Sequence, residues 1–235
     1  PVTPVFLDLP LISGDEVPHA PHLALSATPW PGTVAVYEAA QDSDYSLNGV
    51  VAARSVVGLT ETDLPAARSG VIDSGAPLEV RLASGSLQSV SDAALLGGGN
   101  LMAIGDGTPG NWELFQFRDA ELISDGRWRL SHRLRGQLGS DALMPSSWPA
   151  GSWVVLLDGT PSQVALKSLH RGLERHYRIG PASQAYDHAS YEHRVHVFEG
   201  NGLRPYRPVH LKAEQANGDL SIEWVRRTRI DGDGW

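Results

Sequence analysis

Three histidines in the last quarter of this 235-residue sequence are the strongest candidates for metal ligands. His188, His193 and His196 lie in one short segment. If residues 191–198 form a strand, His193 and His196 point to opposite faces of the sheet, because side chains alternate along a strand. A shared metal ion would therefore need ligands from another part of the chain.

The other short motifs that could carry chemistry fit turns or extended segments better than sites. His19 and His22 flank Pro21, whose ring favours extended backbone, so the two imidazoles do not share a helix face as in an HExxH zinc site. The acidic run at residues 231–234 begins like a calcium loop but lacks the later oxygen ligands, and residues 42–44 are equally generic. Cysteine, GxSxG and phosphate-binding glycine loops are absent. We therefore assign no catalytic, metal-binding or cofactor-binding residue and expect neither a cofactor nor enzymatic activity.

The elements that carry these residues are predicted to be strands. The chain has 25 glycines and 16 prolines, and its short apolar runs are separated by turn motifs. Strands joined by short turns are typical of barrels and sandwiches, so we expect an all-β fold of barrel or sandwich domains with few short helices. The expected strands are residues 34–37, 49–57, 78–82, 100–104, 112–118, 121–124, 127–133, 153–157, 195–198, 209–213 and 220–225.

Two segments depart from this pattern. Residues 164–177 have apolar side chains at helical spacing, but Gly172 interrupts them, so helix and strand both remain open. Residues 1–33 are rich in proline and predict an extended arm or linker with one strand. Within the clearest strands, Trp112 and Leu130 alternate with polar neighbours, and both are expected in the core.

The net charge of −8 is unevenly distributed. Residues 1–118 hold four basic and 13 acidic residues, a formal charge of −9, whereas residues 119–235 hold 15 basic and 14 acidic residues. A protein that grips nucleic acid needs a basic face, and the first half is the opposite. Its acidic side chains either form an ordinary solvated surface or repel DNA, and the solvated surface is the simpler interpretation.

Two motifs are the most specific in the sequence, LRGQLG at residues 134–139 and RRTRIDGD at residues 226–233. With them, the chain resembles the C-terminal region of the host-specificity tail proteins of alphaproteobacterial gene transfer agents and related siphophage-like prophages. The resemblance covers nearly the whole chain, with a conservative departure at Ser140, where the family usually has threonine. The other segments that carry it are residues 112–122, 127–141, 149–158, 177–182 and 202–211.

The resemblance implies a structural role. Members of this family, the large "megatron" baseplate hub proteins, assemble as trimers that close the distal end of the tail tube. It implies a virion component at the tail tip, assembled in the bacterial cytoplasm, that takes part in host attachment and DNA delivery. The expected partners are its own copies in a homotrimer, other tail hub and distal tail proteins, and a host surface glycan, while DNA passes through the channel without specific binding. The family's glycoside-hydrolase-like barrel lies nearer the N-terminus, and nothing here resembles it, so any catalysis is expected outside this segment.

Four regions are expected along the chain. They are an extended arm or linker (1–33), a β-barrel domain of the tail-hub type (34–160), a smaller β subdomain or connector (161–207) and the incomplete start of a fibronectin type III-like module (208–235). The last region begins with a proline and two predicted strands, and Leu220, Ile222 and Trp224 share one face of the second. A full sandwich of this type needs about seven strands.

Arginines are the candidate contact residues. Guanidinium groups form bidentate pairs with carboxylates, and those of residues 127–135 either pair within the chain, with acids such as Glu113 and Glu121, or join subunits or domains. Gly136 and Gly139 then allow a tight turn with positive φ. The candidates for inter-subunit or inter-domain contacts are Arg127, Arg129, Arg133, Arg135, Arg226, Arg227 and Arg229.

A carbohydrate-binding or receptor-recognition module is the alternative function. The chain has seven tryptophans, and most of them lie in predicted strands, where packing is the default. A few exposed ones could form a platform on which sugar rings stack. Glycan binding by the purified protein, beside a mass measurement for trimers, would separate the two functions.

Overall fold

The computed structural model describes residues 1–216 and 218–227. Strands hold 42% of the residues and helices 8%, so the prediction of an all-β fold with few short helices is confirmed. The helical elements are α1 (Asp92–Leu96), η1 (Gln137–Leu143), η2 (Ser168–His170) and η3 (Asn201–Leu203). Within the described ranges, none of them is long and apolar enough to span a membrane.

The strands follow one another along the chain in this order: β1 (Thr3–Leu7), β2 (His22–Ser26), β3 (Val34–Ala39), β4 (Ser46–Val51), β5 (Val57–Thr60), β6 (Leu64–Pro65), β7 (Ile72–Asp73), β8 (Leu78–Leu82), β9 (Leu101–Gly105), β10 (Trp112–Ser124), β11 (Arg127–Leu134), β12 (Ser147–Trp148), β13 (Trp153–Leu156), β14 (Ser162–Gln163), β15 (Arg175–Pro181), β16 (Glu192–His196), β17 (Val209–Ala216) and β18 (Asp219–Val225).

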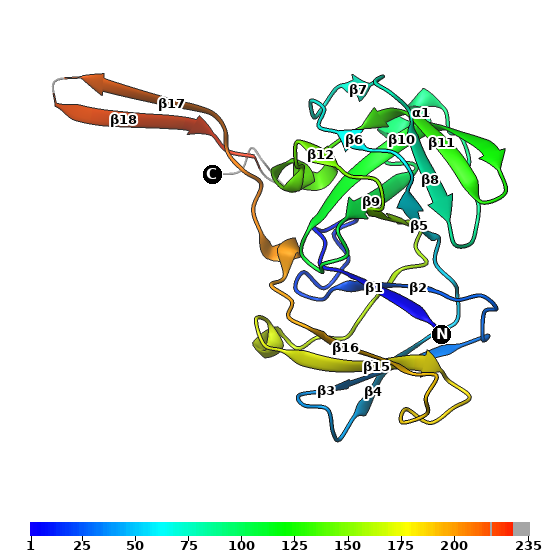
Figure 1. The fold of residues 1–235 in the computed structure, drawn as a ribbon. Coiled ribbons are helices and arrows are strands. Elements are labelled where there is room, and N and C mark those ends of the chain that lie inside the picture. Colours follow the sequence, from blue (N-terminus) through cyan, green and yellow to red (C-terminus); the bar gives the residue numbers. More distant parts are fainter. Residues whose placement is uncertain (217, 228–235) are drawn as a thin grey trace.

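A six-stranded antiparallel barrel forms the upper body of the molecule (Figure 1). Its strands are hydrogen-bonded in the order β10–β9–β13–β5–β8–β11, and β11 pairs with β10 to close the ring, while β7 pairs with the far end of β11. Met102 and Ile104 of β9 pack in the interior with Phe115 and Leu130, whereas Ala103 packs on the outside. Closure pairs the edges that an open sheet would leave exposed.

A small sheet of β1, β2 and β14 forms a layer between the barrel and a second sheet (Figure 1). Phe6 and Leu23 pack toward the lower sheet, whereas Leu7 and Ala24 pack against the barrel. Residues 1–33 thus contain two core strands, instead of the arm or linker with one strand that was expected. The difference has a physical reason, because β2 is buried on both faces and so lacks the polar–apolar alternation of a half-buried strand.

The lower sheet has the strand order β16–β15–β3–β4. Val34 and Val36 of β3 pack with Tyr177 and Ile179 of β15, although the two strands are about 140 residues apart in sequence. The ambiguous segment 164–177 forms the short η2 and the start of β15, and it contains no α-helix.

Both predicted core residues are buried, Trp112 with 1% and Leu130 with 0% of its surface exposed. Leu130 lies inside the barrel. Trp112 lies on its outer face, where it packs against the apolar side chains of β1. The two residues therefore belong to different cores, one within the barrel and one between the barrel and the middle layer.

Candidate interaction sites

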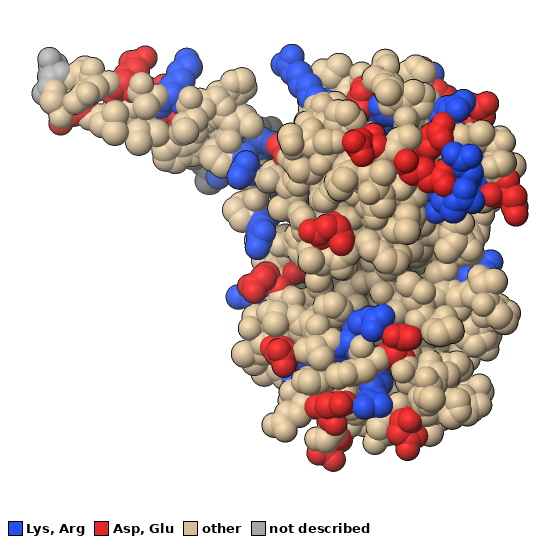
Figure 2. All heavy atoms as spheres, viewed as in Figure 1, with Lys and Arg blue, Asp and Glu red and all other residues tan. Residues whose placement is uncertain are grey.

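Arg127 and Arg129 form a ladder of ion pairs on the outer surface of the barrel. Arg129 lies directly across from Glu79 of β8, and their side chains approach to 3.0 Å. Glu79 also accepts a 3.2 Å bond from Arg127, which pairs with Glu61, and Glu121 lies 3.3 Å from Arg129. Figure 2 shows acidic and basic side chains interleaved on this side of the barrel. Such half-exposed pairs contribute about 0–1 kcal/mol each.

Arg135, by contrast, is fully buried, and so is its partner Glu113. Arg135 Nε and Nη2 donate to the two carboxylate oxygens of Glu113 at 2.6 and 2.8 Å. The same carboxylate accepts hydrogen bonds from Trp148 Nε1 at 2.7 Å and from the Gly136 amide at 3.2 Å. All of these donors point to one buried carboxylate, which links β10 to β12 and to the residues that directly follow β11.

Arg133 is also buried, with 1% of its surface exposed. The preceding residue, His132, adopts a φ of 54°, and the guanidinium that follows points to Asp73 of β7 at 2.8 and 3.0 Å. Burial acts to raise the pKa of the Asp73 carboxyl, but the Gly75 amide and Arg133 outweigh it and hold that pKa below 3.8. Arg133 therefore fastens β7 to β11.

Arg227 holds the base of the β17–β18 hairpin against the barrel. Its Nη1 lies 3.4 Å from Asp141 of η1, and its guanidinium lies 5.0 Å from the centre of the Tyr206 ring. That ring covers Gly139, where an added Cβ would come within 2.2 Å of Tyr206 Cδ1. Gly136 and Gly139 have φ values of 60° and 82°, so the predicted turn with positive φ is present.

The seven candidate arginines thus fall into three groups. Arg127, Arg129, Arg133, Arg135 and Arg227 pair with carboxylates of their own chain. Arg226 is exposed, and Arg229 lies outside the described residues. Contacts between subunits or domains stay a prediction for the exposed and half-exposed members, while Arg133 and Arg135 are covered by their own chain.

The β17–β18 hairpin projects from the body (Figure 1). Leu220, Ile222 and Trp224 of β18 are 63%, 49% and 57% exposed, and Leu211 of β17 is 69% exposed. A two-stranded hairpin is at best marginally stable alone, and clustered exposed apolar side chains mark interaction surfaces. The hairpin is therefore the clearest surface on this chain for contact with other protein.

Acidic residues of the first half pair with arginines of the second. Ion pairs that join residues 1–118 to residues 119–235 offset much of the −9 charge in three dimensions, so the acidity of the first half is not a continuous anionic face. Asp42 and Glu61 are paired with arginines in this way, so they do not support the interpretation of a DNA-repelling surface. The pairs are Glu38–Arg175, Asp42–Arg178, Glu61–Arg127, Asp73–Arg133, Glu79–Arg129 and Glu113–Arg135.

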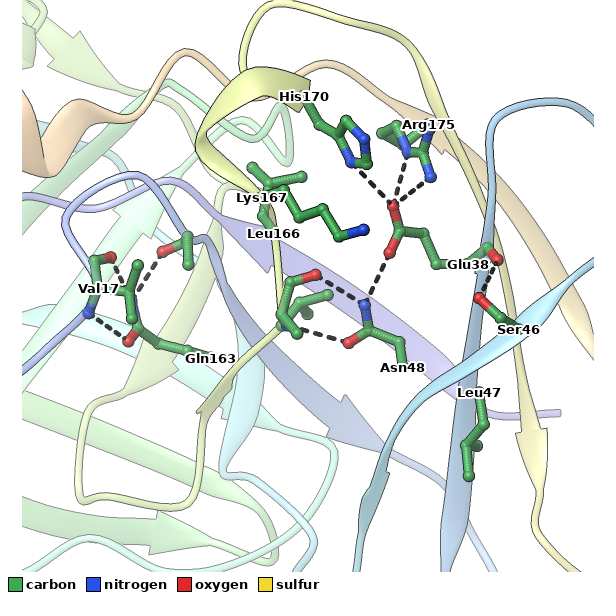
Figure 3. Close-up of a pocket in the computed structure, with 13 residues that line it drawn as sticks. Val17, Glu38, Ser46, Leu47, Asn48, Gln163, Leu166, Lys167, His170 and Arg175 are labelled. Carbon is green, nitrogen blue, oxygen red and sulfur yellow. Dashed lines mark hydrogen bonds and ion pairs between the residues drawn. The ribbon is translucent and has the colours of Figure 1, made fainter.

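A cavity of about 540 Å³ opens between β3, β4 and the segment before β15 (Figure 3). Glu38 lines this cavity and accepts from Arg175 at 2.6 Å and from Asn48 Nδ2 at 3.0 Å. Asn48 Nδ2 also donates to the Ala165 carbonyl at 2.7 Å. Lys167 extends toward the same space (Figure 3). The lining offers charges, amide groups and the imidazole of His170, but no phenylalanine, tyrosine or tryptophan ring, so it suits a small polar ligand.

The histidine cluster of the sequence is divided by the structure. His196 packs against Phe6 in the core, where burial lowers its pKa, and His188 bonds to Ser190. His193 faces the other way and meets His176 of β15 and Asp42. Within the described residues, these three form a group that could hold a metal ion. The sequence indicated that a metal site here would need ligands from another part of the chain, and His176 and Asp42 are in place to serve as such ligands. His176 could have been identified only from the register in which β15 pairs with β16.

The other motifs are placed as follows. His19 Nε2 bonds to the Leu166 carbonyl at 2.9 Å, and His22 is buried, which lowers its pKa. The acidic run at 231–234 lies outside the described residues. Among the described tryptophans, Trp224 is the exposed one, whereas Trp112 and Trp148 are buried and the others are partly covered.

The comparison with known families identifies one segment. Residues 55–155 match the family model described as "Rcc01698-like, C-terminal". The match spans the barrel strands from β5 to β13, which is less than half of the chain. Rcc01698 is associated with a Rhodobacter gene transfer agent, and the match is compatible with a protein related to gene transfer agents. No curated protein matches the chain.

Proposed function

We propose that this chain is a structural component of a phage-like tail tip, part of the baseplate hub that closes the distal end of the tail tube. In this role it takes part in host attachment and DNA delivery. The observation that carries the proposal is the family match over residues 55–155. The second specific motif, at residues 226–233, lies outside that match and extends the same resemblance toward the end of the chain.

Two structural features support a role in an assembly. The barrel is fastened internally by the buried pair of Arg135 and Glu113, which favours a rigid body. The hairpin carries apolar side chains on the outside, which favours contact with further protein in the assembled state. On this proposal the chain acts as a homotrimer in the virion, assembled in the bacterial cytoplasm, beside other tail hub and distal tail proteins. DNA passes through the channel without specific binding.

Immunogold labelling of purified particles tests this proposal. An antibody raised against the barrel should label one end of the tail, and particles from a deletion strain should have tails without this tip and should not deliver DNA. Particles that lack the label, or a deletion that leaves tails and delivery unchanged, would refute the tail-tip role.

A variant of the hairpin tests how the chain is held in the particle. Leu220→Ser, Ile222→Ser and Trp224→Ser together should leave the thermal midpoint of the body unchanged but prevent incorporation, because the apolar contact face is lost. The matched control is Glu223→Ser on the same strand, which should be incorporated normally. Normal incorporation of the triple variant would exclude the hairpin as a contact surface.

A carbohydrate-binding or receptor-recognition module is the second candidate, and the polar cavity around Glu38 is the observation that favours it. A saccharide would bind there mainly through hydrogen bonds, since no phenylalanine, tyrosine or tryptophan ring lines the cavity. A glycan array with the purified chain tests this, with Asn48→Ala and Lys167→Ala as loss-of-binding variants. Signals that persist in both variants would place any glycan elsewhere.

A further inference from the structure

Asp42, His176 and His193 come together on the outer face of the lower sheet. Their potential ligand atoms all lie within 4.8 Å of one another. His176 Nδ1 is 3.1 Å from His193 Nε2, which is 3.8 Å from Asp42 Oδ1. The strand register causes this meeting: His193 lies across from Arg178 of β15, two residues from His176, so the two imidazoles are diagonal neighbours on one face.

We propose that Asp42, His176 and His193 bind one divalent transition-metal ion of the zinc class. Two imidazole nitrogens and a carboxylate oxygen are ligands that Zn²⁺, Cu²⁺ and Ni²⁺ accept. Two nitrogens bound to a tetrahedral zinc ion at ~2.0–2.1 Å are about 3.3 Å apart, so the 3.1 Å separation here requires little movement. Three protein ligands leave one position for water or for a donor from another molecule.

The surrounding groups orient these ligands. Glu174 lies 3.5 Å from His176 Nε2, so a carboxylate faces the imidazole nitrogen that does not point to the ion, as is usual for metal-binding histidines. Tyr45 and Arg178 donate to Asp42 Oδ1 at 2.6 and 2.9 Å. These two donors hold the Asp42 carboxylate in place beside the imidazole of His193.

The charge at the site favours a cation, and the types of its ligands determine which one. Arg178 is a cation beside the site, but the carboxylates of Asp42 and Glu174 outnumber it. Mg²⁺ and Ca²⁺ prefer oxygen ligands and bind poorly to imidazole. The site should therefore bind Zn²⁺ and Cu²⁺ while rejecting Mg²⁺ and Ca²⁺ at the same concentration.

Isothermal titration of the tag-free chain with ZnCl₂ at neutral pH tests the proposal. One ion per chain is expected, and His176→Ala and His193→Ala should each weaken binding by more than about tenfold, the smallest loss usual for even an outer-shell partner. The matched control is His188→Ala, which removes an exposed histidine outside the cluster and should bind as tightly as the unsubstituted chain.

Electron paramagnetic resonance of the unsubstituted chain with one equivalent of Cu²⁺ gives a test that needs no variant. Splitting by two imidazole nitrogens is expected, and by one nitrogen in each folded histidine variant. A copper spectrum without two nitrogen ligands would overturn the proposal, as would zinc binding that His188→Ala weakens as much as His193→Ala. Absence of binding would leave the two stacked rings, 5.3 Å apart, as a histidine–histidine contact only.

Discussion

Replacement of Glu113 by alanine should strongly destabilise the protein, because it leaves the fully buried Arg135 guanidinium with Asp73, 3.9 Å away, as its remaining ion-pair partner. The Glu113 carboxylate accepts two bonds from Arg135 and one each from Trp148 and Gly136, and all of these donors would lose their acceptor. Removal of one partner of a buried ion pair costs about 3–5 kcal/mol. In a chain of this length about 2–4 °C is lost per kcal/mol, so the thermal midpoint should fall by about 6–20 °C.

The assay is reversible urea unfolding beside a thermal scan. Glu121→Ala is the matched control, because it removes an ion pair of an exposed carboxylate from the same strand and should cost about 0–1 kcal/mol. The double variant Glu113→Leu with Arg135→Met should recover part of the stability, since apolar replacement of a whole buried pair is often neutral, while Trp148 Nε1 and the Gly136 amide still lack their acceptor. A loss below about 1 kcal/mol for Glu113→Ala would show that the buried pair does not carry the cost assigned to it.

Three further substitutions have definite outcomes. Trp112→Ala should cost about 3–5 kcal/mol in urea unfolding, and an unchanged midpoint would mean that the residue is not packed as described. Glu61→Gln should reduce the loss of stability that occurs as the pH falls below about 4.5. A hydrogen bond from Arg127 lowers the pKa of the Glu61 carboxyl from its usual 4.5, so the stabilisation by this carboxylate is full above that pH and is lost as the pH falls further. An unchanged dependence of stability on pH in the variant would contradict this assignment. Gly139→Ala should lower the thermal midpoint, because the added Cβ displaces the Tyr206 ring. Gly159→Ala is the control: it introduces the same strain of a positive φ but has nothing within 4 Å of the added Cβ, so it should lower the midpoint less.

Local patterns predicted the strands best where one face is buried and the other meets solvent. The expected strand at residues 78–82 is β8, and the expected strand at 127–133 is β11 without its last residue. The segments 112–118 and 121–124 proved to be one long strand, β10, because its pairing with β11 continues through Asp119 and Ala120.

The remaining features depend on contacts between distant residues. Closure of the barrel requires β10 to pair with both β9 and β11, and no local pattern contains that information. The burial of β1 and β2 depends on the two layers that cover them. His176 lies on β15 and Asp42 lies in the connection between β3 and β4, so their approach to His193 depends on the pairing of β15 with both β16 and β3.

The pairing of β3 with β15 has a consequence for synthesis on the ribosome. The two strands are about 140 residues apart, and translation proceeds at about 5–20 residues per second, so β3 waits about 7–28 s for its neighbour. The barrel strands emerge in between and can close first, while β3 keeps an unsatisfied apolar face and an open edge. Slower codons or chaperone capture during this interval would therefore act on the lower sheet and spare the barrel.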